Sequence, residues 1–115
     1  MCLLLTGYVH SAVAAEHGDA LRGKAVAHVR CLPCHHLHQS SRGIGPSLQG
    51  IFNRAPSISG VPFSHWDASA LDVWLKGPRL IKPNTEMSIP PMSERDRTDV
   101  IAYLRDAKKD ETGRD

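Results

Sequence analysis

The chain has 115 residues, a net charge of +2 at pH 7 and 41% hydrophobic residues, which fits one small domain. This length argues against a multidomain enzyme. The near-balanced charge argues against both a disordered polyelectrolyte and a strongly basic nucleic-acid-binding domain. Only 5% of the residues are aromatic, so we expect something besides side chains to fill the centre of the fold.

The N-terminal residues have the pattern of a secretory signal peptide. Residues 2–15 carry no charged side chain, and Val13 and Ala15 stand at the −3 and −1 positions of a cut before Glu16. The basic residues that usually lead such a peptide are missing. We expect residues 1–15 to be removed on export. No other apolar run is long enough to span a bilayer, so no stable membrane insertion is expected.

A first helix is predicted over residues 20–31. Asp19 is a suitable N-cap, and Leu21, Ala25 and Val29 recur at the spacing of one helix face. This stripe is therefore expected to face the core.

Closely spaced Gly and Pro residues prevent any long element from residue 36 to residue 66. Irregular chain of this length is expected inside a small domain only where it wraps around something. A second helix is predicted over residues 68–76, with Asp67 as its cap and Gly77 and Pro78 at its end.

Residues 78–92 are rich in Pro and are predicted to form another loop. A last helix is expected over residues 94–108, because Ser93 and Asp96 form a capping box. Residues 110–115 are expected to be a charged, frayed tail. The apolar face of the helix predicted over residues 94–108 would comprise Val100, Ile101, Leu104 and Ala107. With no alternating strand pattern, the sequence predicts an all-α fold of three main helices joined by long loops.

Residues 31–35 carry the chemistry, because they read Cys-Leu-Pro-Cys-His. Two cysteines at this spacing, Cys31 and Cys34, invite a disulfide, a redox pair, or a metal or haem site. Two Cys three positions apart at a helix end reach both vinyl groups of one porphyrin, and His35 then reaches the iron. A redox pair needs a βαβ context, and His36 and His38 lie too close to His35 to complete a zinc site. We therefore expect one covalently attached haem c.

The sixth iron ligand decides between two kinds of chemistry. An open iron site binds small ligands, whereas a closed site favours electron transfer. Met87 and Met92 both lie in the Pro-rich loop before the last helix. Met87 is the expected ligand because it ends a polar run, residues 83–87, in which a gap-filling role is weaker. Met92 is the alternative.

The sequence resembles the class I cytochromes c, of the mitochondrial and bacterial soluble type, over about residues 18–109. The resemblance is carried by the haem motif and by the runs at 45–54, 83–87 and 99–104. It implies a small cytochrome c fold wrapped around one haem, with the domain spanning residues 16–109.

The resemblance also implies roles for five residues around the haem. The Pro46 carbonyl would accept a hydrogen bond from the proximal His and raise its basicity. Arg54 would lie near a haem propionate, and the Trp66 indole would donate to one. Trp74 stands where the family usually has a Tyr, and would pack against the haem. Thr85 would lie beside the haem.

Other positions bear on packing and partners. By the same resemblance, Gly23 would let the last helix approach closely at Val100 and Tyr103. Ala27 replaces a bulky aromatic residue at that crossing, which is expected to loosen it. Glu86 replaces a Lys just before the expected ligand, which alters the charge that partners meet.

These features together predict a soluble, exported, monomeric electron carrier rather than an enzyme. A respiratory quinol-oxidising complex is the expected donor, and a terminal oxidase or reductase the expected acceptor. The compartment would be the periplasm or an intermembrane-space-like one. Two alternatives stay open: an open-site haem protein for gas sensing or weak peroxidase activity, and a haem subunit of a larger oxidoreductase complex.

Overall fold

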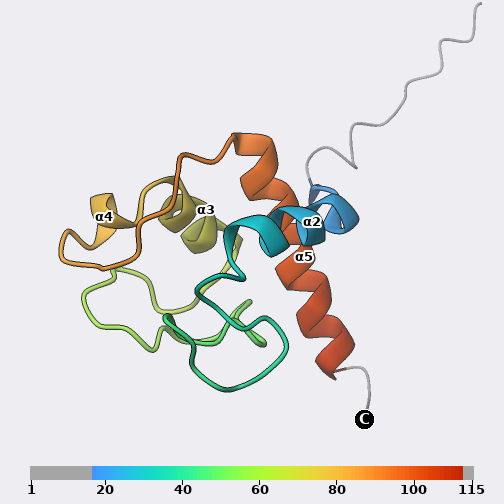
Figure 1. Ribbon diagram of the computed structural model, residues 1–115, viewed down its shortest axis with the longest axis horizontal. Coiled ribbons are helices and arrows are strands. Elements are labelled where there is room, and N and C mark those ends of the chain that lie inside the picture. Colours follow the sequence, from blue (N-terminus) through green and yellow to red (C-terminus); the bar gives the residue numbers. More distant parts are fainter. Residues whose placement is uncertain (1–16, 113–115) are drawn as a thin grey trace, which may run out of the picture.

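The computed structural model describes residues 17–112. Its helices are α2 (Ala20–Arg30), α3 (Ala68–Lys76), α4 (Pro78–Ile81) and α5 (Glu94–Thr112), and no strand occurs within the described part. α2 crosses α5, α3 packs on α5, and the long loops lie to one side of α5 (Figure 1). The expected signal peptide lies outside the described residues. None of the described helices is long and apolar enough to cross a membrane.

A side-chain cap begins each of the three longer helices, as the sequence predicts. The cap oxygen accepts the backbone N–H three residues later: Asp19 from Arg22 at 3.0 Å, Asp67 from Ala70 at 2.8 Å, and Ser93 from Asp96 at 3.1 Å. These hydrogen bonds satisfy N–H groups that have no partner within the helix.

Two expectations about secondary structure are wrong. Residues 78–92 were expected to be loop throughout, but Pro78–Ile81 forms α4, for which a proline in the first turn is well suited. α5 continues to Thr112 rather than ending at residue 108. Its last turns include Arg105, Ala107, Lys108 and Lys109, residue types with high helix propensity, which supports the longer helix.

The face of α2 that packs is not the predicted apolar stripe. Leu21 is 81% and Val29 75% exposed, and Ala25 is exposed as well, whereas Gly23 and Ala27 are buried. The expectation that the stripe faces the core is therefore wrong. Small residues face α5 because the two helices approach too closely for larger side chains.

Gly23 makes this close approach possible. A Cβ built on Gly23 would lie 1.8 Å from the Asp99 carbonyl oxygen and 3.0 Å from the Val100 nitrogen. The nearest atoms are thus backbone atoms of Asp99 and Val100, so the expected close approach at Val100 is confirmed. Ala27 is completely buried at the same crossing.

A charged network seals the crossing. The Asp99 carboxylate, only 4% exposed, accepts the Asp19 N–H at 2.8 Å and Arg22 Nη1 at 2.7 Å. Arg22 Nη2 also donates to Asp96 at 2.7 Å. Burial of the Asp99 carboxylate opposes its ionisation. The Asp19 and Arg22 hydrogen bonds and the charges of Arg22 and Arg95 outweigh that effect, so the pKa of Asp99 lies below its usual value.

We expect Gly23→Ala to cost about 2–3 kcal/mol of unfolding free energy, because the new methyl group meets backbone that moves only if the helices separate. Urea denaturation measures this loss. Lys24→Ala, at an exposed neighbouring position, is the control and is expected to change little. A loss below about 0.5 kcal/mol for Gly23→Ala would contradict the close contact.

Asp99 predicts how stability depends on pH. Because its pKa is lower in the folded chain, Asp99 stabilises the fold above its unfolded pKa of about 3.9, and this contribution disappears as pH falls through the folded pKa. The gap in urea midpoint between wild type and Asp99→Asn should be constant near neutrality and shrink below about pH 4. Asp106→Asn, at an exposed position of α5, should show no such gap. A gap independent of pH would refute this explanation.

Candidate haem site

The Cys-x-x-Cys-His segment folds into a tight turn at the end of α2. Cys31 is the C-cap of α2, and its carbonyl accepts the N–H groups of Cys34 at 3.2 Å and His35 at 2.9 Å. Cys31 is buried, Cys34 is exposed, and neither forms a disulfide. Burial raises the pKa of the Cys31 thiol to about 11, against the opposing charge of Arg30. One turn therefore carries two cysteines that are not joined in a disulfide.

The His35 ring is oriented by the chain that follows it. Its Nδ1 donates to the Pro46 carbonyl oxygen at 2.6 Å, which is the contact that the family resemblance implies. The Gly45 N–H donates to the Cys34 carbonyl at 2.7 Å, so the Gly45–Pro46 segment is fixed to the turn that carries the ring. With Nδ1 engaged as donor, Nε2 is the ring nitrogen left to bind a metal ion.

Gly45 leaves room for this ring. A Cβ at Gly45 would lie 2.4 Å from His35 Cε1 and 2.8 Å from Nδ1. Sequence reasoning did not single out Gly45. The sequence signal that could have found it is that Gly45 directly precedes Pro46. A His35 ring that lies against the Pro46 carbonyl also covers the residue before it, where a side chain would be in the way.

Met87 and Trp74 are in direct contact. The indole N–H of Trp74, from α3, donates to the Met87 sulfur with the two atoms 3.1 Å apart. The Met87 N–H donates to the Thr85 hydroxyl at 3.3 Å, so the Thr lies beside this methionine as well. Sequence reasoning gave Trp74 a packing role only. Its donor role was missed because it depends on where the loop places the sulfur.

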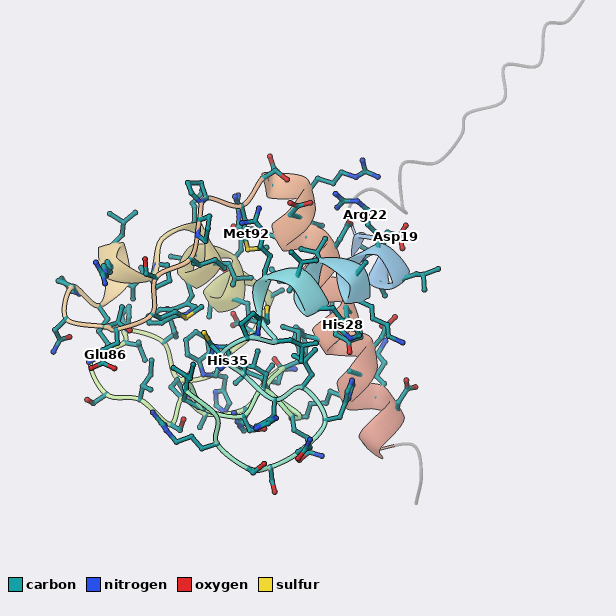
Figure 2. All side chains as sticks on the ribbon, viewed as in Figure 1. Asp19, Arg22, His28, His35, Glu86 and Met92 are labelled. Atoms are coloured by element: carbon teal, nitrogen blue, oxygen red, sulfur yellow. The ribbon has the colours of Figure 1, made fainter. Side chains whose placement is uncertain are left out.

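Met92 occupies a different environment. It is 5% exposed within the hydrophobic core, and Figure 2 shows it beside the beginning of α5, whereas Glu86 lies at the outer edge of the preceding loop. Met87 is partly buried against the same core and has its sulfur directed at Trp74. The two methionines thus differ in role: one fills the core, and the other presents a sulfur.

Arg54 and Trp66 are brought together by backbone pairing. The Asn53 N–H donates to the Trp66 carbonyl at 2.9 Å, and the Trp66 N–H to the Arg54 carbonyl at 2.8 Å. The Arg54 guanidinium donates to the carbonyls of Ser47 and Gln49, which fixes its charge beside residues 47–49. The Trp66 ring is 6% exposed and packs edge-on against Trp74, with 5.5 Å between the ring centroids.

These residues fit a covalently held haem better than the rival sites. Within residues 17–112 no three His, Cys, Asp or Glu side chains cluster as a metal site. The described chain also gives the Trp66 indole N–H no hydrogen-bond partner, which leaves this donor available for a ligand carboxylate. Free thiols, an oriented imidazole and a directed thioether sulfur complete the set of groups that a c-type haem requires.

Comparison with known proteins defines the class. The cytochrome c family model matches residues 20–108. The chain is 32% identical to cytochrome c2 of Rhodopila globiformis, covering 82% of this chain and 98% of the relative. It is 30% identical to cytochrome c of Gibberella zeae, covering 80% and 97%, and 32% identical to cytochrome c2 of Rhodomicrobium vannielii, covering 84% and 85%.

The protein therefore belongs to the cytochrome c family. The expected all-α fold is confirmed, and so is the expected cofactor: the protein binds one haem c covalently and acts as a haem-based electron carrier. Its helices, free of strands in the described part, agree with the small fold of that family.

We expect Gly45→Ala to displace the His35 ring and break its hydrogen bond to Pro46. The imidazole of the haem-loaded protein then binds iron more weakly, so acidification should abolish the low-spin absorption spectrum at a higher pH than in wild type. Ile44→Ala, at an exposed neighbouring position, should behave as wild type. An unchanged acid transition in Gly45→Ala would show that the ring keeps its place.

Proposed function

We propose that this protein is an exported one-electron carrier in which Cys31 and Cys34 hold the haem, and His35 and Met87 bind its iron from opposite sides. When bound, the haem supplies an iron that gains and loses a single electron. The observation that carries this proposal is the contact between the Trp74 N–H and the Met87 sulfur, which directs a thioether from a loop that α3 and α5 hold in place.

On one side, His35 acts as a fixed and basic ligand. The Pro46 carbonyl accepts the hydrogen bond from Nδ1, which leaves Nε2 for the iron and increases its donor strength. Gly45 supports this orientation sterically. Because both contacts come from the backbone of residues 45 and 46, they hold the imidazole in one orientation.

On the other side, Met87 supplies a soft donor. A thioether favours the reduced iron and raises the reduction potential relative to harder ligands. Trp74 keeps the sulfur in place, and because an indole is a donor only, it takes no proton from the site. The tryptophans 66 and 74, both 6% exposed, add an apolar wall that limits water.

Polar groups at the edge of the site suit the haem carboxylates. We assign the Trp66 indole as a donor to one propionate, since its ring lies on the same wall as Trp74 and its N–H has no partner in the described chain. Arg54 is paired with Trp66 through the backbone and adds a positive charge nearby, which favours the ionised propionate.

The carrier is proposed to work outside the cytoplasm, in a periplasm or an intermembrane-space-like compartment, after removal of residues 1–15. It would accept electrons from a membrane quinol-oxidising complex and pass them to a terminal oxidase or reductase. As a monomer it would meet each partner briefly through a small interface around the haem edge.

Substitution of the two loop methionines tests the proposal. In the haem-loaded protein, Met87→Ala should lose the weak sulfur-to-iron charge-transfer band and make the reduced form bind carbon monoxide. Met92→Leu, which conserves volume in the core, should keep the band and cost less than about 1.5 kcal/mol of stability. Absorption spectra of oxidised and reduced protein, with and without carbon monoxide, measure both effects.

The opposite results would overturn the assignment. If Met92→Leu lost the band and Met87→Ala kept it, Met92 would be the ligand. A wild-type protein that binds carbon monoxide readily would have an open iron site, and sensing or peroxidase chemistry would replace electron carriage. A stable complex isolated with the protein would indicate a subunit of a larger oxidoreductase.

A further inference from the structure

The loop that carries Met87 is held unevenly along its length. Near α4, the Lys82 N–H donates to the Pro78 carbonyl at 2.9 Å and the Thr85 N–H to the Lys82 carbonyl at 3.0 Å. In the described chain, residues 88–91 make no hydrogen bond, and two of them are prolines without an N–H. The far end of the loop therefore needs another attachment.

Arg97 supplies this attachment. Its guanidinium is almost fully enclosed, with the residue 7% exposed, and its Nη1 donates to the Met92 carbonyl oxygen at 2.7 Å. Its Nε donates to the Asp72 carboxylate at 2.8 Å, an ion pair with α3. One side chain of α5 thus joins the end of the loop to α3, which also carries Trp74. No other hydrogen bond holds residues 88–92 within the described part of the chain.

We propose that Arg97 and Asp72 are positioning residues that keep the loop of residues 82–93 closed, and that they thereby set how often the Met87 sulfur leaves the iron. The proposal rests on the assignment of Met87 as ligand. Neither residue touches the iron ligands; they act through the carbonyl of Met92, five positions after Met87.

The ion pair between Arg97 and Asp72 explains why these two residues, here called the clamp, favour the closed loop. A guanidinium that is buried needs an acceptor in the plane of each N–H it directs inward, and here Asp72 and Met92 provide two. Opening the loop removes the Met92 carbonyl and leaves one of these donors without a partner. With Asp72 replaced by an apolar residue, Arg97 gains by moving toward water, and the closed loop loses its advantage.

The chain offers a matched control. Arg22 and Asp96 form a second Arg–Asp pair, also at 2.7–2.8 Å between nitrogen and oxygen as in the first, but at the α2–α5 crossing. Removing the carboxylate of Asp72 or that of Asp96 breaks one ion pair of α5. Only the removal of Asp72 acts on the ligand loop.

The experiment compares ferric wild type with Asp72→Ala and Asp96→Ala by titration with imidazole, followed by absorption. Imidazole binds only when Met87 has left the iron, so its apparent dissociation constant falls as the open fraction rises. We expect Asp72→Ala to bind imidazole about tenfold more tightly than wild type, the factor that corresponds to losing one charge-assisted hydrogen bond. Asp96→Ala should bind it as wild type does, although we expect urea denaturation to show that both variants are destabilised.

A second variant guards against a folding defect. Arg97→Lys keeps the positive charge but lacks the fork of donors that serves Asp72 and Met92 together. It should also tighten imidazole binding while retaining the fold.

The clamp is refuted if Asp72→Ala and Arg97→Lys bind imidazole as wild type does, or if Asp96→Ala tightens binding equally, since the effect would then follow global stability. Failure of the ligand assignment looks different. In that case wild type itself binds imidazole without displacing a sulfur band, and Met87→Ala leaves the affinity unchanged.

Discussion

The contact between the backbones of α2 and α5 at Gly23 is the constraint on which the rest of the structure depends. It brings the two ends of the described chain together with almost no side chain between them, and Ala27 and the carboxylate of Asp99 complete the seal. The residues between α2 and α5 form loops and short helices whose two ends are held by this contact. The haem site is built from these intermediate segments rather than from the crossing itself.

The two sides of the haem site are supported in different ways. The imidazole of His35 is held by backbone: a turn at the end of α2, the carbonyl of Pro46, and the missing side chain of Gly45. The sulfur of Met87 is held by side chains from α3 and α5, which reach it directly or through the loop. The first arrangement therefore changes only when the backbone or Gly45 changes, whereas the second changes with single side chains of α3 or α5.

Sequence reasoning succeeded where the determining physics is local. Asp19, Asp67 and Ser93 were identified as caps because a cap needs only a suitable side chain three residues before a free N–H. The Cys-x-x-Cys-His motif predicted the cofactor because its chemistry is contained in five consecutive residues. The family resemblance added the Pro46 contact, which no local pattern specifies.

It failed where the outcome depends on distant parts of the chain. Leu21 and Val29 form a convincing apolar stripe, but the distance between α2 and α5 selects small residues for the contact. The sequence does not single out Arg97, because its burial follows from where Asp72 and the end of the loop lie in the fold. Likewise, nothing near Trp74 in the sequence indicates that a sulfur from the next loop will reach its N–H.

The crossing also has a consequence for the order of events in folding. Arg22 and Asp99, which meet there, are separated by 77 positions in the chain. Closing so long a loop costs entropy before any contact repays it, and contacts of such separation slow folding. When the chain is synthesised from its N-terminus, α2 has no helix to pack against until α5 has been made. The Cys-x-x-Cys-His segment is therefore complete and accessible well before the fold that will bury Cys31 can form.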